Sequence, residues 1–206
     1  MILNAEAIAG LEQRKRAAFV NSLPGFKPGT LVGTVNAAGI TNAAIFSSVL
    51  HIGANPALMG LLFRPLSVPR HTYQNIKETG YFTLNHITEK IYRAAHKTSA
   101  RFDDGVSEFA TCGLTEEYRD TLPAPYVQES PVRIGLKYAE EHLISANQTV
   151  LVIGQIVEVI FPDGCMADDG YLDLEGAGIL TVSGLDSYHT TRRISRLPYA
   201  KPDSVL

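Results

Sequence analysis

A run of twelve residues reads Thr41-Asn42-Ala43-Ala44-Ile45-Phe46-Ser47-Ser48-Val49-Leu50-His51-Ile52 and contains no Asp, Glu, Lys or Arg. Its apolar and hydroxyl-bearing residues predict one β-strand over residues 41–52 with a polar centre. The run belongs to a longer segment, residues 28–63, that also lacks these four residue types. Asn, Pro and Gly interrupt this segment before it offers the roughly 18 consecutive apolar residues of a membrane span. We therefore expect successive buried strands and no membrane association.

The rest of the chain predicts more strands, with helices inserted between some of them. Hydrophobic periodicity predicts helices over residues 4–21, 69–79 and 89–100 and a helical turn over residues 107–110. The proline-rich residues 122–125 predict a loop. Further strands are predicted over residues 31–35, 58–63, 81–86, 132–145, 150–161 and 179–182. Because strands follow one another with short connections, we expect a mainly β protein. Its sheet or barrel is antiparallel with peripheral helices, and a doubly wound parallel sheet is disfavoured.

Length, charge and cysteine content restrict the class of protein. The 206 residues predict a single domain, residues 1–206, with an N-terminal helix within residues 1–25 and a C-terminal arm over residues 187–206. A net charge of −3 provides no broad basic surface, so we expect no nucleic-acid partner. The two cysteines form neither a disulfide framework nor a zinc cluster, and they suit a reducing compartment, the cytoplasm.

Several common catalytic and nucleotide-binding motifs are missing from the sequence. Gly176-Ala177-Gly178 lacks the third glycine and the following helix of a dinucleotide-binding fingerprint. The histidines form no His-Glu-x-x-His arrangement, and no Gly-x-Ser-x-Gly elbow is present. The sequence therefore gives no support to a Rossmann site, a zinc hydrolase or a serine hydrolase, and we predict no metal site.

Hydrogen-bond donors gather in three segments where strands or helices are expected to end. The first is the polar strand around Ser47-Ser48, the second contains Arg64, Arg70 and Thr72, and the third contains Thr98 and Ser99. A phosphate monoester binds well to hydroxyl groups, an arginine and a helix N-terminus, whose dipole favours anions. A planar ring needs main-chain donors at its polar edge and small or apolar side chains against its face. These segments could supply both kinds of contact.

The same residues occur in a recognisable order. They are Asn42 with Phe46-Ser47, Asn55-Pro56, Thr72 with Asn75-Ile76, Gly80-Tyr81-Phe82 with Asn85, Thr98-Ser99 with Phe102, Glu129-Ser130-Pro131-Val132, and Ile153-Gly154-Gln155-Ile156. In this order the chain resembles the flavin reductase-like family of FMN-binding split-barrel flavoproteins over about residues 30–187. Relatives often have Pro and Phe before the serine, whereas here Ile45 precedes Phe46.

The resemblance implies a fold, an assembly and a site. The implied fold is a Greek-key antiparallel split barrel, which forms a homodimer with FMN near the subunit interface. Carried over by position, residues of the polar strand line the flavin ring and the ribityl chain: Asn42, Ala43, Ala44, Ile45, Phe46, Ser47 and Ser48. Arg64, Arg70 and Thr72 are expected to approach the phosphate. Thr98 and Ser99 are expected to close the pocket.

The function that follows is that of an FMN-dependent oxidoreductase, with NADH or NADPH as electron donor and a small molecule or free flavin as acceptor. The cofactor carries the redox chemistry, so no catalytic side chain is named. Backbone N–H groups of the polar strand are expected to face the polar edge of the ring. A partner monooxygenase could receive the reduced flavin. The basic C-terminal arm could cover the flavin of the partner subunit or serve as a solvated dimer arm.

Three alternatives remain open at this point. A non-catalytic FMN binder or electron carrier would share every pocket residue. An interaction protein could have the same barrel without a cofactor. An activity like that of pyridoxamine-phosphate oxidase is a further alternative on the same fold. The choice between NADH and NADPH, and the identity of the acceptor, are also left open.

Overall fold

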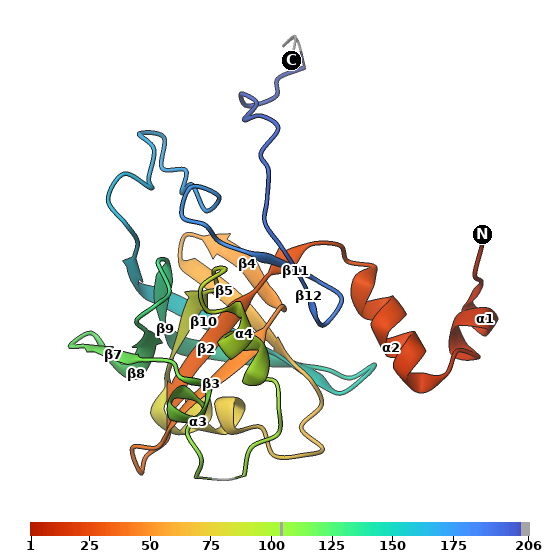
Figure 1. Cartoon of the computed structure of the whole chain (residues 1–206), viewed down its shortest axis with the longest axis horizontal. Helices are drawn as coiled ribbons and strands as arrows, with labels where there is room; N and C mark the ends of the chain where they lie inside the picture. The colour runs from red at the N-terminus through yellow and green to blue at the C-terminus, as the bar shows by residue number, and fades with distance from the viewer. Residues whose placement is uncertain (104, 203–206) are drawn as a thin grey trace.

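The computed structural model describes residues 1–103 and 105–202 and consists mainly of antiparallel strands (Figure 1). The helices are α1 (Ala5–Ala9), α2 (Gln13–Ser22), α3 (His71–Thr79), α4 (Tyr92–Lys97) and α5 (Glu108–Cys112). The strands are β1 (Lys27–Pro28), β2 (Thr30–Val35), β3 (Thr41–Phe46), β4 (Val49–Ala54), β5 (Ala57–Phe63), β6 (Tyr81–His86), β7 (Glu116–Arg119), β8 (Leu122–Val127), β9 (Arg133–Ile144), β10 (Thr149–Ile160), β11 (Thr181–Ser183) and β12 (Ser187–His189).

Seven strands form one antiparallel sheet in the order β3-β2-β6-β9-β10-β5-β4. Its two end strands, β3 and β4, are joined by only two residues, Ser47 and Ser48. In a flat sheet of this order the end strands would lie about 29 Å apart. The chain from Phe46 to Val49 can span at most about 11 Å. The sheet must therefore curl until its ends meet, which makes a barrel that is split between β3 and β4.

This architecture confirms the expected mainly β, antiparallel Greek-key split barrel with peripheral helices, but it corrects one strand. Residues 41–52 were expected to form a single strand, and they form two. The break falls at Ser47-Ser48, the polar centre of the run. Strand propensity indicates that both halves are extended but does not reveal that they pair on opposite ends of the sheet.

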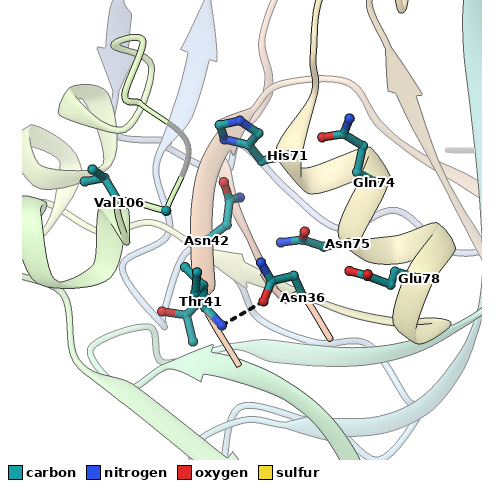
Figure 2. Close-up of a pocket in the computed structure, with 10 residues that line it drawn as sticks. Asn36, Thr41, Asn42, His71, Gln74, Asn75, Glu78 and Val106 are labelled. Carbon is teal, nitrogen blue, oxygen red and sulfur yellow. Dashed lines mark hydrogen bonds between the residues drawn. The ribbon is translucent and has the colours of Figure 1, made fainter. Parts of the chain in front are cut away.

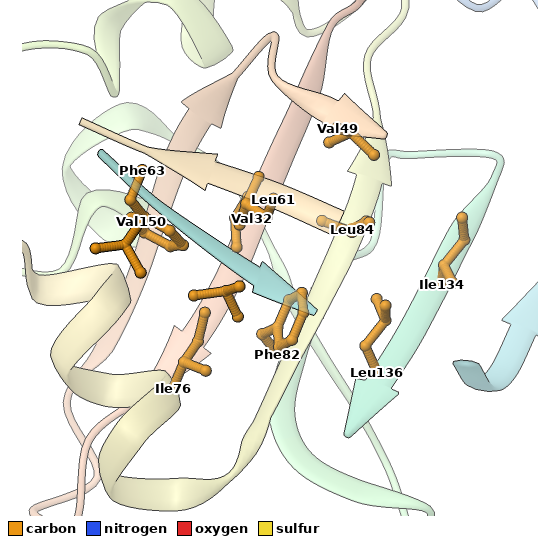
Figure 3. Close-up of a cluster of buried hydrophobic side chains, with 11 residues drawn as sticks. Val32, Val49, Leu61, Phe63, Ile76, Phe82, Leu84, Ile134, Leu136 and Val150 are labelled. Atoms are coloured by element: carbon orange, nitrogen blue, oxygen red, sulfur yellow. The ribbon is translucent and has the colours of Figure 1, made fainter. Parts of the chain in front are cut away.

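The barrel interior holds one cluster of buried apolar side chains (Figure 3). Val32, Leu61, Phe82 and Leu136 enter it from four strands, and Ile76 of α3 closes one end. A second cluster lies on the outside of β2 and β3, beneath α4 and α5, and contains Leu31, Ala43 and Phe109 among others. Because β2 separates the two clusters, all six of its residues are buried. The expectation of successive buried strands is confirmed for β2 but wrong for β4, an end strand of the sheet in which Val49 alone is buried.

β8 contains the proline-rich residues that were expected to form a loop. It pairs only with β7, and it packs against β2 at Gly33, where an added Cβ would lie 2.3 Å from the carbonyl oxygen of Pro125. Thr83 donates a hydrogen bond to the same oxygen at 2.7 Å. Proline is tolerated in such a strand because no ladder bond is required from its nitrogen.

The predicted N-terminal helix over residues 4–21 is divided into α1 and α2, because Gly10 ends the first and the Glu12 carboxylate caps the second. Neither helix contains a buried residue, and both project from the barrel (Figure 1). α4 is shorter than the predicted helix over residues 89–100. None of the described helices has the length and apolar character needed to cross a membrane.

His86, at the end of β6, is buried, and its Nδ1 has no hydrogen-bond partner among the described residues. Burial lowers the pKa of this imidazole to about 4. The unfolded chain takes up this proton near pH 6.5 and the folded chain only near pH 4. Folding stability is therefore lost as the pH falls through this window.

We expect the free energy of unfolding to fall by about 3 kcal/mol more for the wild type than for His86→Gln between pH 7 and pH 4. Urea denaturation at several pH values measures this difference, and the neutral glutamine controls for all other titrating groups. Parallel curves for the two proteins would contradict the assignment.

Candidate functional site

β3 is the strand on which the predicted site segments converge. Its side chains and outer edge contact α3, α5, the end of α4, and β5 through hydrogen bonds and one ring contact. β3 is an end strand of the sheet, so the N–H and C=O groups of its outer edge need partners outside the sheet. The inserted helices supply acceptors for two of these groups, the N–H groups of Ala43 and Ile45.

The first contact joins Asn42, Thr72 and Glu108, all three buried. The amide orientation that satisfies every atom has Nδ2 of Asn42 donating to the Glu108 carboxylate at 3.2 and 3.3 Å. Oγ1 of Thr72 then donates to Oδ1 of Asn42 at 2.9 Å. Glu108 also accepts a bond from the backbone N–H of Ala43 at 3.3 Å. Burial raises the pKa of the Glu108 carboxyl above its ordinary value.

The second contact joins β3 to the end of α4. The backbone N–H of Ile45 donates to Oγ1 of Thr98 at 3.0 Å, and that hydroxyl donates to the carbonyl oxygen of Ala95 at 2.7 Å. The N–H groups of residues 43 and 45 are thus both engaged within the chain. The backbone donors of this strand were expected to face a ligand ring. The N–H groups of residues 43 and 45 donate instead to Glu108 and Thr98, which belong to the helical segment inserted between β6 and β7.

The third contact lies at the barrel split. Ser48 donates through Oγ to the carbonyl oxygen of Leu62 at 2.8 Å, and its own carbonyl accepts from the Leu62 N–H at 3.2 Å. These bonds fix the connection against β5, two residues before the exposed Arg64. Phe46 and Phe63 pack edge to face at 5.2 Å, which joins the same two elements beneath the surface.

The start of α3 provides a cationic, donor-rich end to the site. Arg70 occupies the N-cap position, where no side-chain bond caps the helix. The arginine Nε is buried and has no hydrogen-bond partner among the described residues. An unpartnered buried donor is costly and calls for an acceptor. A phosphate oxygen fits this position, because the helix dipole and the arginine charge both favour an anion.

A small polar hollow opens beside Thr41 and Asn42 of β3 and next to His71, the first residue of α3 (Figure 2). It has a volume of about 140 Å³ and lies between α3, the β2–β3 hairpin and residues 105–106. Asn36, Gln74, Asn75 and Glu78 line it with amide and carboxylate groups. Binding pockets for drug-sized molecules usually measure about 300–1,000 Å³. The hollow is therefore too small for a tricyclic ring.

The predicted site residues divide into two groups by exposure. Asn42, Ala43, Thr72 and Thr98 are buried and are held by other groups of the chain. The remaining eight are partly or fully exposed: Ala44, Ile45, Phe46, Ser47, Ser48, Arg64, Arg70 and Ser99. Sequence reasoning missed Glu108, because one glutamate in a short helix resembles a solvated residue. The structure brings the predicted segments together, while ligand contact by these residues stays a prediction.

Comparison with known proteins identifies the family. Residues 25–176 match the family described as the flavin reductase like domain, and this is more than half of the chain. The chain therefore belongs to the flavin reductase like family, a family of flavoproteins.

Solved structures share the fold over nearly the whole chain. A Shewanella frigidimarina protein, described as a flavin reductase with a split barrel domain, is 47% identical and has a TM-score of 0.94, covering 97% of this chain and 100% of that one. Nitrilotriacetate monooxygenase component B from Bacillus cereus is 19% identical with a TM-score of 0.82, covering 96% and 98%. The 2-nitrobenzoate 2-nitroreductase of Pseudomonas fluorescens is 22% identical with a TM-score of 0.81, covering 99% and 100%. The last two similarities concern the fold alone.

Glu108 is expected to hold the outer edge of β3, and two substitutions test this. Glu108→Ala leaves the Ala43 N–H and the Asn42 amide without their acceptor, so we expect a loss of about 2–4 kcal/mol in the free energy of unfolding. Glu108→Gln keeps an acceptor oxygen and should lose less. Because burial raises the pKa of Glu108, the stability of the wild type relative to Glu108→Gln should fall as the pH rises through that pKa.

Urea denaturation of the three proteins between pH 4 and pH 8 gives both quantities. Equal stabilities for Glu108→Ala and the wild type would show that the contact with β3 contributes nothing.

Proposed function

We propose that this chain is an FMN-dependent oxidoreductase that uses NADH or NADPH and delivers electrons to a small acceptor or to free flavin. The observation that carries the proposal is the start of α3, where the buried Nε of Arg70 has no hydrogen-bond partner among the described residues. Arg70 stands at the N-terminus of α3, the helix that a hydrogen bond between Thr72 and Asn42 joins to β3. Membership of the flavin reductase like family supports the same reading.

The phosphate end of FMN would be held by charge and by the helix N-terminus. Arg70 and the exposed Arg64 supply the positive charge. Thr72 has its hydroxyl hydrogen engaged by Asn42, so it would position the first turn of α3 and offer its backbone N–H. Bonds between arginine and phosphate are charge-assisted and are about twice as strong as neutral ones.

The ring and the ribityl chain would lie along the barrel split. Ser47 and Ser48 are partly exposed there and carry hydroxyl groups, and Ile45 and Phe46 offer apolar atoms beside them. Ala43 is fully buried in the second apolar cluster, so it would help to position β3 and would not touch the ligand. Ser99, exposed at the end of α4, would close the pocket.

FMN, when bound, supplies the capacity to accept a hydride and to release the electrons to an acceptor. The side chains around the split then have three tasks: to hold the phosphate, to orient the ring and to keep one ring face accessible to a nicotinamide. None of these tasks requires a side chain that donates or removes a proton, so no catalytic residue is assigned. A nicotinamide can reach an open ring face without a Rossmann domain.

A second copy of the chain would complete the assembly as a homodimer. The outer face of β4, β5 and β10 supports this, because Leu50 and Ile52 are 45% and 39% exposed there. Gly60 lies on the same face, where an added Cβ would touch both Ile52 and Leu151. An apolar sheet face of this kind is typical of an interface. A two-fold axis would pair it with itself.

Two further parts of the proposal concern a partner protein and the cellular compartment. Component B of nitrilotriacetate monooxygenase shares the fold, which is compatible with a partner monooxygenase that receives reduced flavin. Cys112 and Cys165 are both free thiols, and this suits the cytoplasm.

Arg70→Ala is expected to weaken FMN binding ten- to hundredfold, because one charge-assisted bond to phosphate is removed. Fluorescence titration of the apoprotein with FMN measures the dissociation constant, and riboflavin, which lacks the phosphate, should bind the variant and the wild type equally. Arg14→Ala, on the exposed helix α2, is the matched control and should bind FMN normally. Unchanged FMN affinity in Arg70→Ala would place the phosphate elsewhere.

Anaerobic mixing of the FMN-loaded protein with NADH or NADPH tests the redox activity. We expect the visible absorbance of the bound oxidised flavin to bleach with at least one donor. Absence of bleaching with both donors, while FMN stays bound, would favour the alternative of a non-catalytic FMN binder or electron carrier.

A further inference from the structure

The described part of the C-terminal arm beyond β12, residues 190–202, is fastened to the body of its own chain by two arginines. Arg193 forms an ion pair with Asp173 at 3.2 Å. The backbone N–H of Arg193 donates to Glu175 at 2.6 Å. Arg196 pairs with Asp169 and lies 4.1 Å from the centre of the Tyr171 ring. The arm is therefore held at the loop of residues 169–175 as far as Arg196.

The three large apolar side chains of the arm are mostly exposed on their own chain. Ile194 is 99% exposed, Leu197 is 67% exposed and Tyr199 is 88% exposed. Figure 1 shows the arm running away from the barrel to the C-terminus. Three large apolar groups on one basic segment are expected to be buried against another molecule.

A groove of about 470 Å³ beside the root of the arm has complementary chemistry. Glu89, Glu129 and Glu175 line it together with a single lysine, Lys90, so its charge is negative. Pro131 and Ile179 add apolar surface to the same groove. The arm carries Arg192 beside its three apolar residues, whereas Arg193 and Arg196 are already paired with Asp173 and Asp169 of their own chain.

The position of the groove also suits a second copy of the chain. Thr190 and Thr191, the root of the arm, form part of its lining. An arm from a partner that entered this groove would pass next to the root of the resident arm. Two chains related by a two-fold axis would then place their arms antiparallel and exchange them reciprocally, which is a closed arrangement.

We propose that in the homodimer the arm of one chain lies in the acidic groove of the other. Ile194, Leu197 and Tyr199 are covered by the partner, and Arg192 of the arm meets the glutamates of the groove. This inference rests on the homodimer of the proposed function. It assigns the arm a role in assembly and places no arm residue at the split between β3 and β4.

Disulfide trapping between differently tagged chains tests the contact. In a background of Cys112→Ala and Cys165→Ala, one chain carries Ala177→Cys in the groove, and the other carries Ser195→Cys or Ala200→Cys in the arm. After co-expression and mild oxidation, we expect a covalent dimer of the two tags on non-reducing gels with at least one arm variant. Val20→Cys, 44% exposed on α2, replaces the arm cysteine in the control and should give no link.

The outcomes separate the arm from the dimer. A wild-type chain that sediments as a monomer at every concentration overturns both the homodimer and the arm contact. A dimer that forms no link through either arm cysteine overturns the arm contact alone. So does a single chain carrying both cysteines that closes only an internal disulfide.

A second measurement does not depend on cysteine geometry. Replacing Ile194 and Leu197 together by Asp should raise the dimer dissociation constant roughly tenfold or more in sedimentation equilibrium, because apolar anchors are lost. Leu23→Asp, a substitution of a residue that is 62% exposed after α2, is the matched control. Unchanged dimerisation in the arm variant, with the helical and strand signal of the wild type, would contradict the proposal.

Discussion

The connection of two residues between β3 and β4 is the constraint on which the rest of this structure depends. It joins the two end strands of a seven-stranded sheet, so the sheet cannot stay flat. Closure buries the apolar side chains of Val32, Leu61 and Phe82 in the interior. The same closure leaves the edges of β3 and β4 meeting without a shared ladder. A barrel with such a split has unpaired backbone groups at one place, and that place coincides with the proposed cofactor site.

The helical insertion between β6 and β7 solves the problem that the split creates. Thr98 and Glu108 accept the outward N–H groups of residues 45 and 43, and the apolar side of the insertion covers the outside of the barrel. A carboxylate is expensive to bury, yet here it satisfies both a backbone donor and the Asn42 amide. The residues that shape the site are thus mostly engaged with one another, which keeps β3 rigid. The exposed residues around them are left to meet a ligand.

The sequence predicted which polar residues gather around β3, while the contact of these residues with a ligand stays a prediction. Asn42, Thr72 and Thr98 were expected to contact a ligand, because polar residues at element ends commonly do so. In the structure they bind one another or the backbone and are buried. Glu108 was not predicted, since its burial depends on α5 packing against β3, a contact between residues far apart in the chain. Local pattern cannot distinguish a polar group that supports a site from one that lines it.

The amino-acid sequence by itself determined the mainly β class, most strand positions and the family, because these follow from local periodicity and from the order of short motifs. Only the tertiary structure decided that residues 41–52 form two strands, that the proline-rich residues 122–125 belong to a strand, and that the N-terminal helix is two helices. Each of these depends on what the segment packs against or fails to pack against. The physical reason is that propensity acts within a few residues, whereas sheet order and closure are set by contacts between distant segments of the chain.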